Sequence, residues 1–369
     1  MQRTPRHMAW WLPTACLLVI GLASANAAEE LSWPLSRQML SQARLELLWQ
    51  DAIALGEGEK LDAMTVLDNR LYIRSRDNYV WSINRATGNM IFYRSIAPAG
   101  FPILGWVPYG QDLITVITNQ VYEFSKDTGS QRRTVDLELS IVAPVVRNDE
   151  YYYVSATDGR LHAFRAEGMV RIFRASPGND SMITSVVANN DRVVFATDAG
   201  NLIGMVPDGP DRLWQFNAGG PIVGPVVADG DSLFVASKDT YVYRVDVTGR
   251  TEATLAWRYQ AEAMLDREPR VTDSTVYQYA IGQGLTAIDK QSGRELWSLP
   301  EGVDLLSEAR GKAYVFTQHK TLAVMDNAIG KQLYSVNLAA VTKYAVNTAD
   351  ANIYVADEQG HVACLRPTR

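Results

Sequence analysis

Histidine and cysteine are the side chains in this sequence best suited to hold a metal or to act in catalysis, and both are scarce. Beyond the first 27 residues the chain has three histidines, His162, His319 and His361, and one cysteine, Cys364. The histidines lie in different copies of the sequence repeat described below, at positions that are not equivalent, so they do not form a clustered metal-ligand set. The sequence contains no Cys-x-x-Cys-His haem attachment site. A single cysteine also excludes an intramolecular disulfide, and Cys364 is expected to be a small buried apolar residue in a strand.

The sequence also lacks a phosphate-binding loop and a catalytic triad. The closest approach to a glycine-rich loop is Gly219, Gly220 and Gly224, but Pro221 interrupts it and Pro225 follows it. Candidates for a Ser-His-Asp triad lie in repeat turns that already explain their polar side chains. The sequence therefore predicts a protein that is not an enzyme and that carries no cofactor or metal ion.

The balance of charge limits the partners that the chain could have. It has 35 lysine and arginine residues against 41 aspartate and glutamate residues, a net charge of −6. Without Arg3 and Arg6, which belong to the leader described next, 33 basic residues remain and the net charge is −8. Nucleic acid and anionic membrane surfaces would repel a chain this acidic, so neither is expected as a partner.

The first 27 residues have the pattern of a secretory signal peptide. Basic residues precede an apolar run from about Met8 to Ala23, and Ala25-Asn26-Ala27 is a small-x-small cleavage site. The apolar run is too short for a membrane span. Cys16 lies inside this run rather than at its end, so no lipid anchor is predicted. The mature chain should begin at Ala28 and be exported to the periplasm, either free there or peripheral to the outer membrane.

The stretch AIDKQSGRELW, from Ala287 to Trp297, is a tight hairpin that the chain repeats. An alternating run ends at Asp289, Gly293 stands in the turn, and a second run brings in Trp297. Glycine adopts the positive φ that such a turn requires. Degenerate copies have their turn glycines at Gly88, Gly129 and Gly330, and longer versions lead to Trp214 and Trp257.

A second landmark, a strand such as IVAPVVRND from Ile141, precedes the hairpins. The landmarks begin near Leu61, Ile103, Ile141, Ile183, Ile222, Leu265, Val303 and Val341. The seven intervals from Leu61 to Val341 cover 280 residues, a mean of 40. A period of this size with four short strands per repeat predicts an all-β fold, an eight-bladed β-propeller of four-stranded blades.

The two ends of the chain complement one another. The last repeat, from Val341 to Arg366, has only three strands, whereas residues 45–53 supply a strand with Trp49 in the position of Trp297. We therefore expect this N-terminal strand to close the ring as the fourth strand of the last blade, because closure removes two open sheet edges. Residues 28–369 contain no linker-like stretch and should form a single propeller domain, a monomer within a larger complex.

The hairpin Ala-x-Asp-x-x-x-Gly-x-x-x-Trp after a Pro-Val-Val strand resembles the pyrroloquinoline-quinone (PQQ)-like repeat over roughly residues 45–366. In size, closure and export signal the chain is most similar to the BamB-type propellers of the outer-membrane β-barrel assembly machinery. The resemblance implies a non-catalytic scaffold that binds protein partners. The alternatives are a periplasmic propeller that binds a small ligand such as a quinone or sugar, and a degenerate PQQ-dependent dehydrogenase. Active dehydrogenases of this family carry an adjacent cysteine pair and long insertions, which this sequence lacks.

Charged residues gather at one point of the predicted ring. Overlaying the repeats on Pro144 and Pro225 places six side chains at one mouth of the central channel. These are Asp62, Trp106, Arg267, Glu268, Asp304 and Lys343. Inner strands are crowded around the axis, where charges are costly unless they are paired or hydrated. The cluster is therefore interpreted either as a set of ion pairs that seals the channel or as a polar recognition site.

Overall fold

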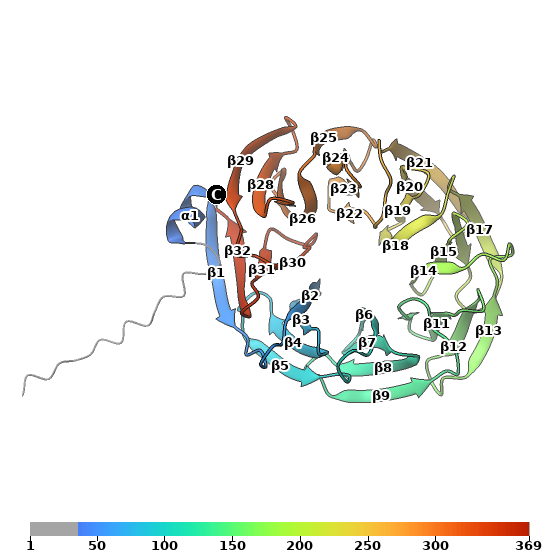
Figure 1. The fold of residues 1–369 in the computed structure, drawn as a ribbon. Helices are drawn as coiled ribbons and strands as arrows, with labels where there is room; N and C mark the ends of the chain where they lie inside the picture. The colour runs from blue at the N-terminus through green and yellow to red at the C-terminus, as the bar shows by residue number, and fades with distance from the viewer. Residues whose placement is uncertain (1–35, 369) are drawn as a thin grey trace, which may run out of the picture. The chain divides into compact units, whose positions relative to one another are not determined.

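The computed structural model describes residues 36–368, which form eight four-stranded sheets around a central axis (Figure 1). Neighbouring strands within each sheet are antiparallel. The predicted all-β, eight-bladed propeller of four-stranded blades is therefore confirmed. The predicted signal peptide, residues 1–27, lies outside the described part of the chain.

Blades 1 to 7 each take four consecutive strands, beginning with the strand nearest the axis (Figure 1). Blade 1 consists of β2 (Leu61–Leu67), β3 (Arg70–Ser75), β4 (Tyr79–Asn84) and β5 (Met90–Ser95). Blade 2 consists of β6 (Ile103–Tyr109), β7 (Asp112–Ile117), β8 (Gln120–Ser125) and β9 (Gln131–Asp136). Blade 3 consists of β10 (Val146–Arg147), β11 (Tyr151–Ser155), β12 (Leu161–Arg165) and β13 (Arg171–Ala175). Blade 4 consists of β14 (Ile183–Ala188), β15 (Val193–Thr197), β16 (Asn201–Met205) and β17 (Arg212–Asn217).

The second half of the ring follows the same order. Blade 5 consists of β18 (Ile222–Asp229), β19 (Ser232–Ser237), β20 (Tyr241–Thr248) and β21 (Glu252–Gln260). Blade 6 consists of β22 (Arg270–Val271), β23 (Thr275–Ala280), β24 (Gly284–Asp289) and β25 (Glu295–Leu299). Blade 7 consists of β26 (Gly302–Ala309), β27 (Lys312–Thr317), β28 (Thr321–Asp326) and β29 (Lys331–Asn337).

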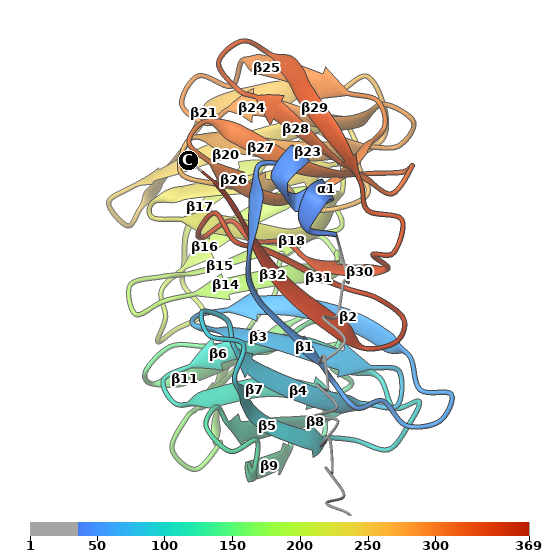
Figure 2. The same ribbon diagram turned by 90° about the vertical axis from the view of Figure 1, so that its left-hand side faces the viewer.

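Blade 8 joins the two ends of the described chain. It combines β30 (Lys343–Ala345), β31 (Ile353–Ala356) and β32 (His361–Pro367) with the N-terminal strand β1 (Leu45–Ala52), which follows the short helix α1 (Arg37–Gln42). β1 runs antiparallel to β32 along its outer edge (Figure 2). The predicted closure of the ring by an N-terminal strand is confirmed.

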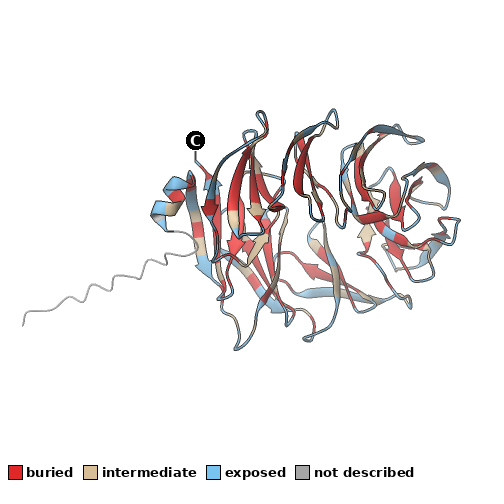
Figure 3. Ribbon diagram, turned by 45° about the horizontal axis from the view of Figure 1, so that its top comes forward, coloured by how far each residue is buried: buried red, intermediate tan, exposed pale blue. Residues whose placement is uncertain are grey.

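The apolar core lies between the blades. The alternation of each strand puts one apolar face against the preceding blade and one against the following blade. One cluster, for example, joins Tyr277 and Trp297 of blade 6 to Leu305 and Val315 of blade 7. Buried residues are concentrated on the strands inside each sheet, whereas the outermost strands are largely exposed (Figure 3). Each blade is therefore stable only in contact with its neighbours.

The strands closest to the axis are short or irregular. β10, β22 and β30 have only two or three residues, and β2, β6, β14, β18 and β26 contain register shifts. Crowding explains this irregularity at Gly224, which has a φ of +67°. A Cβ atom there would lie 2.5 Å from the backbone nitrogen of Glu268 in the next blade. Only glycine allows so close an approach.

The repeated hairpin connects neighbouring blades. In every blade the pairing of the third and fourth strands skips one residue, and the residue after this bulge is here called the joint residue. The joint residues are Trp49, Phe92, Arg133, Phe173, Trp214, Trp257, Trp297 and Tyr334. The turn glycine of the next blade packs beneath the aromatic ring: a Cβ at Gly293 would lie 2.6 Å from Cγ of Trp257. The glycine and tryptophan of the repeat therefore meet across a blade boundary.

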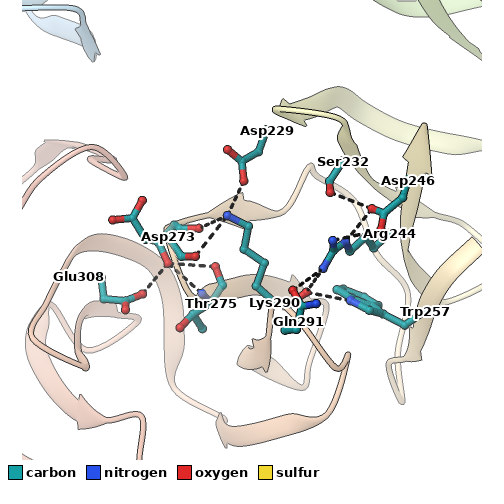
Figure 4. A network of polar contacts seen from close by, with 11 residues as sticks. Asp229, Ser232, Arg244, Asp246, Trp257, Asp273, Thr275, Lys290, Gln291 and Glu308 are labelled. Carbon is teal, nitrogen blue, oxygen red and sulfur yellow. Dashed lines mark hydrogen bonds and ion pairs between the residues drawn. The ribbon is translucent and has the colours of Figure 1, made fainter. Parts of the chain in front are cut away.

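Figure 4 shows the polar part of one such joint, between blades 5 and 6. The Trp257 indole N–H donates to the carbonyl oxygen of Lys290 (2.9 Å), and the Arg244 guanidinium donates to the same oxygen (2.9 Å). The Lys290 ammonium in turn pairs with Asp229 and donates to the carbonyl of Thr272. The turn is thus fixed by side chains from both blades.

The two faces of the ring carry different connections. The connections between blades and the turns between second and third strands lie on one face, here called the entry face. The turns between first and second strands and between third and fourth strands lie on the other, here called the hairpin face. The inner strands begin at the entry face, so the candidate residues of the channel mouth belong to that side.

Candidate functional site in the central channel

A cavity of about 590 Å³ lies on the axis of the ring. Its lining comes from the inner strands of blades 5, 6, 7, 8 and 1 and the residues beside them. It includes Pro225, Glu268, Arg270, Asp304, Tyr344 and Met64. Glu268 and Asp304 are therefore the two predicted site residues that line this cavity.

Arg270 joins these two carboxylates. Its guanidinium makes two parallel hydrogen bonds to Asp304, Nε to Oδ1 and Nη2 to Oδ2, both of 3.1 Å. Its third nitrogen, Nη1, pairs with Glu268. The backbone N–H of Leu305 also donates to Asp304 Oδ1 (2.9 Å). A two-pronged arginine–carboxylate pair is the strong form of this interaction, and it offsets the cost of burying Asp304, which is only 6% exposed.

The electrostatics of the cavity follow from this cluster. Burial alone would lower the pKa of Arg270, but its hydrogen bonds to Asp304 and the charges of both carboxylates outweigh that effect and raise the pKa above its usual range. Burial raises the pKa of Tyr344 to about 12, and the charge of Asp304 adds to the shift. At neutral pH the cavity therefore holds one cation, two carboxylates and a neutral phenol. Its remaining charge is negative, which favours a cationic or hydroxyl-rich occupant.

Two other predicted residues lie near the cavity but do not line it. The Arg267 guanidinium pairs with Asp266, with Nε 3.0 Å from Oδ1, and stacks over the Tyr279 ring at 4.1 Å from its centroid. The carboxylate of Asp62 pairs with the Nη2 of Arg74 on the next strand. Both charges are thus satisfied within their own blades.

Trp106 and Lys343 lie apart from the carboxylates. Trp106 is half-buried on β6 and stacks on Tyr72 of blade 1, with ring centroids 6.5 Å apart and an interplanar angle of 9°. It therefore packs at a blade joint. Lys343 lines a second, smaller cavity at the entry face. The structure thus brings Glu268 and Asp304 together through Arg270, and the other four predicted residues lie outside this cluster.

Arg270 is the residue that the sequence overlay missed. It follows Glu268 by two positions, and alternation along an extended strand puts residues two apart on the same face. That spacing was the available signal. The overlay aligned single positions on Pro144 and Pro225 and so identified the carboxylates without their cation.

Contacts and burial within the fold account for the side chains of His162, His361 and Cys364. His162 is buried, and its Nε2 lies 3.0 Å from the Asp158 carboxylate in the preceding turn. His361 makes the same kind of contact, with its Nδ1 2.7 Å from Asp357. Burial raises the pKa of the Cys364 thiol to about 12, so it is neutral at physiological pH. Within residues 36–368 no three histidine, cysteine or acidic side chains gather as metal ligands would. In the same residues, no helix has the length and apolar character to cross a membrane.

Comparison with known proteins gives a family match and a fold match. The family model described as outer membrane protein assembly factor BamB matches residues 94–221 and 207–310. A search of curated proteins finds no match. The crystal structure of the computationally designed Ika8 protein aligns with a TM-score of 0.64 and 14% identity, over 86% of this chain and all of that one. The crystal structure of BamB from Moraxella catarrhalis aligns with a TM-score of 0.63 and 14% identity, over 87% of this chain and 97% of that one.

The two kinds of match carry different weight. At 14% identity the solved structures establish the fold alone. The family model, by contrast, covers residues 94–310, more than half of the sequence. The chain therefore belongs to the family of PQQ-like repeat β-propellers whose model is described as outer membrane protein assembly factor BamB.

Proposed function

We propose that this chain is a non-catalytic scaffold, exported to the periplasm, that binds protein partners during the assembly of outer-membrane proteins. Membership of the BamB family carries the proposal, because the description of that family names this role. The signal peptide predicted for residues 1–27 supports export. A rigid ring with loops on two faces also suits a scaffold, because surface loops on a rigid framework are common binding elements.

The entry face offers a surface for a protein partner. Phe101, in the connection between blades 1 and 2, is 46% exposed. Met264 and Ile281 are 55% and 48% exposed, and the Ile281 N–H donates to the Met264 carbonyl (3.0 Å), so the two residues are neighbours. Large apolar side chains that face water are typical of interaction sites when they lie together. A partner would bury them.

Affinity capture from a membrane extract tests this function. The tagged mature protein should retain components of the β-barrel assembly machinery, because the proposal places it in that complex. The double variant Met264→Glu with Ile281→Glu should retain less, whereas Ile329→Glu is a matched control because Ile329 is 60% exposed on the hairpin face. An eluate from the unmodified protein that lacks assembly components would overturn the proposal.

A second candidate is a small-ligand function of the channel, which the cavity of about 590 Å³ favours. Ligand pockets commonly have volumes of about 300–1,000 Å³ and a few convergent polar groups. Equilibrium dialysis of the protein against a panel of monosaccharides and against PQQ with calcium would detect such an occupant. Binding that Glu268→Gln weakens and Lys238→Gln leaves unchanged would establish the second candidate. The same preparation should show no dye-linked alcohol oxidation, and turnover above a heat-killed control would contradict a non-catalytic role.

A further inference from the structure

A second cavity, of about 320 Å³, opens at the entry face where blades 7, 8 and 1 meet. Four of the residues that line it are cationic: Lys60, Arg76, Lys320 and Lys343. They come from three blades, so the ring brings them together from distant parts of the sequence. A single carboxylate, Glu358, lines the same cavity. The lining of this cavity is therefore net positive, whereas the chain as a whole has a net charge of −6.

The side chains of these four cations contribute no ion pair to the described fold. None of them belongs to an ion pair among residues 36–368, in contrast to Arg270, Arg74 and Arg267 nearby. Lys60, Arg76 and Lys320 are exposed and Lys343 is half-buried. Like charges that converge on one cavity repel one another unless an anion joins them. The cavity is therefore electrostatically complementary to an anionic group.

Lys320 stands at a backbone position that disfavours lysine. It immediately precedes the third strand of its blade and has a φ of +53°. Glycine occupies the corresponding place at Gly200 and Gly360, and asparagine does so at Asn78. Glycine and asparagine adopt this left-handed conformation readily, whereas longer side chains do so at a cost. The fold thus holds a cation at the rim of the cavity in a backbone conformation that glycine or asparagine would adopt at lower cost.

Apart from Thr342, the remaining lining is apolar. Leu61, Val341 and Phe316 contribute to the cavity beside the cations, and Leu61 and Val341 are buried. An isolated exposed ion pair contributes little to affinity, so a ligand that combined a carboxylate with an apolar side chain would gain more than a free inorganic anion. A polypeptide segment with acidic and apolar residues in alternation has this combination.

We propose that this cavity binds an acidic segment of a protein partner, with carboxylates at the four cations and an apolar side chain against Phe316. The proposal rests on the scaffold function and specifies one of its contacts. An anionic bilayer is disfavoured as the occupant because it would also meet Asp77 and Glu358, which flank the cations at the entry face. A concave cavity likewise suits a segment better than a flat surface.

Fluorescence anisotropy with a labelled six-residue peptide of alternating glutamate and phenylalanine tests this site directly. The intact mature protein should bind the peptide and should not bind a peptide with lysine in place of glutamate. The double variant Lys320→Gln with Lys343→Gln should bind at least about tenfold more weakly, because two charge contacts are lost. Its melting temperature should be unchanged, since neither side chain has an ion-pair partner among the described residues.

Lys238→Gln is the matched control, because Lys238 is an exposed lysine in the corresponding turn of blade 5 and lies outside the cavity. It should bind the acidic peptide as the unmodified protein does. Equal binding by the double variant, or equal binding of the lysine peptide, would overturn the proposal. Sedimentation with anionic phospholipid vesicles that depended on Lys320 and Lys343 would overturn it in favour of a membrane surface. Retention of assembly components by the double variant would refute this site and leave the scaffold function standing.

Discussion

The joint between blades 6 and 7 and the joint between blades 2 and 3 connect neighbouring blades through different side chains. Trp297 and Arg133 are both joint residues, four positions after Gly293 and Gly129. Trp297 is 4% exposed and its ring lies 5.9 Å from that of Tyr277. The Arg133 side chain is 33% exposed. Arg133 is the joint residue that is not aromatic.

The two side chains nevertheless make equivalent hydrogen bonds. The Trp297 indole donates to Asn327 Oδ1 (2.8 Å), and Arg133 Nη1 donates to the carbonyl of Ala166 (3.0 Å). Asn327 and Ala166 are each the first residue after the third strand of the next blade. Lys290 is in the same position, and it accepts from Trp257. Joint residues that carry a donor can therefore hold the next turn by a hydrogen bond, as Trp49 also does with the Arg85 carbonyl (3.0 Å), whereas Phe92 and Phe173 contribute apolar surface alone.

Removal of β1 should have the largest effect, because it eliminates a joint entirely. A mature protein that lacks residues 28–52 would lose Trp49 and its hydrogen bond to the Arg85 carbonyl (3.0 Å). It would also expose the edge of β32. An open edge beside an exposed apolar face promotes aggregation. Size-exclusion chromatography should show aggregates, and a monomer that melts like the parent would contradict the prediction.

Trp297→Ala should come next in size. It creates a cavity in a packed joint and leaves Asn327 Oδ1 without its donor, which should lower the free energy of unfolding by about 3–5 kcal/mol. Urea denaturation followed by circular dichroism measures the change. Trp297→Phe is the control, since it restores most of the apolar surface and should recover more than half of the loss. Equal losses in both variants would show that the hydrogen bond, and not the packing, dominates.

Arg133→Ala should destabilise the ring less, because the side chain is partly exposed and buries little apolar surface. Loss of its hydrogen bond to Ala166 should lower the free energy of unfolding by about 1 kcal/mol. The same urea measurement applies, with Gln131→Ala as the control, because Gln131 is an exposed residue of the same strand, β9. A loss as large as that of Trp297→Ala would refute the distinction between apolar and polar joints.

The repeat predicted much of this architecture. The regular spacing of the landmarks predicted eight blades. The N-terminal strand with Trp49, which has no blade of its own in the sequence, predicted the closure by β1. Both predictions use patterns that are visible within single segments of the chain. The hydrogen bonds that joint residues such as Trp257 and Trp297 donate to the next blade were beyond prediction, because they depend on how two repeats are placed relative to one another. For the same reason the sequence identified Glu268 and Asp304 at the channel but not the pairing of Asp304 with Arg270 of the preceding blade. The stacking of Trp106 on Tyr72 depends on a side-chain direction set by the irregular strand β6, which no periodic pattern reveals.

The smallest effect should come from a substitution in the turn that Trp257 contacts, between β24 and β25. The Ser292 hydroxyl and backbone N–H donate to Asp289 and lower the pKa of its carboxyl. A lowered pKa means that the contribution is present above the unfolded value, near 3.9, and is lost as the pH falls through the folded value. Asp289→Asn should lower the free energy of unfolding by about 0.5 kcal/mol at pH 7. The difference between the two proteins should shrink as the pH falls below the unfolded value, and a difference in urea midpoints that is the same at pH 7 and at pH 3 would contradict the assignment.

The pairing of β1 with β32 also determines when the molecule can finish folding. Leu45 pairs with Pro367, and the Arg44 carbonyl accepts from the Thr368 backbone N–H (2.8 Å), across more than 300 residues of intervening chain. β1 therefore leaves the ribosome long before its partner strand does, and it must stay unpaired until the rest of the chain has been made. Contacts of such long range make folding slow. Any chain that terminates early would lack the partner of β1 and keep an open edge, so proteases and chaperones could distinguish incomplete copies from finished ones.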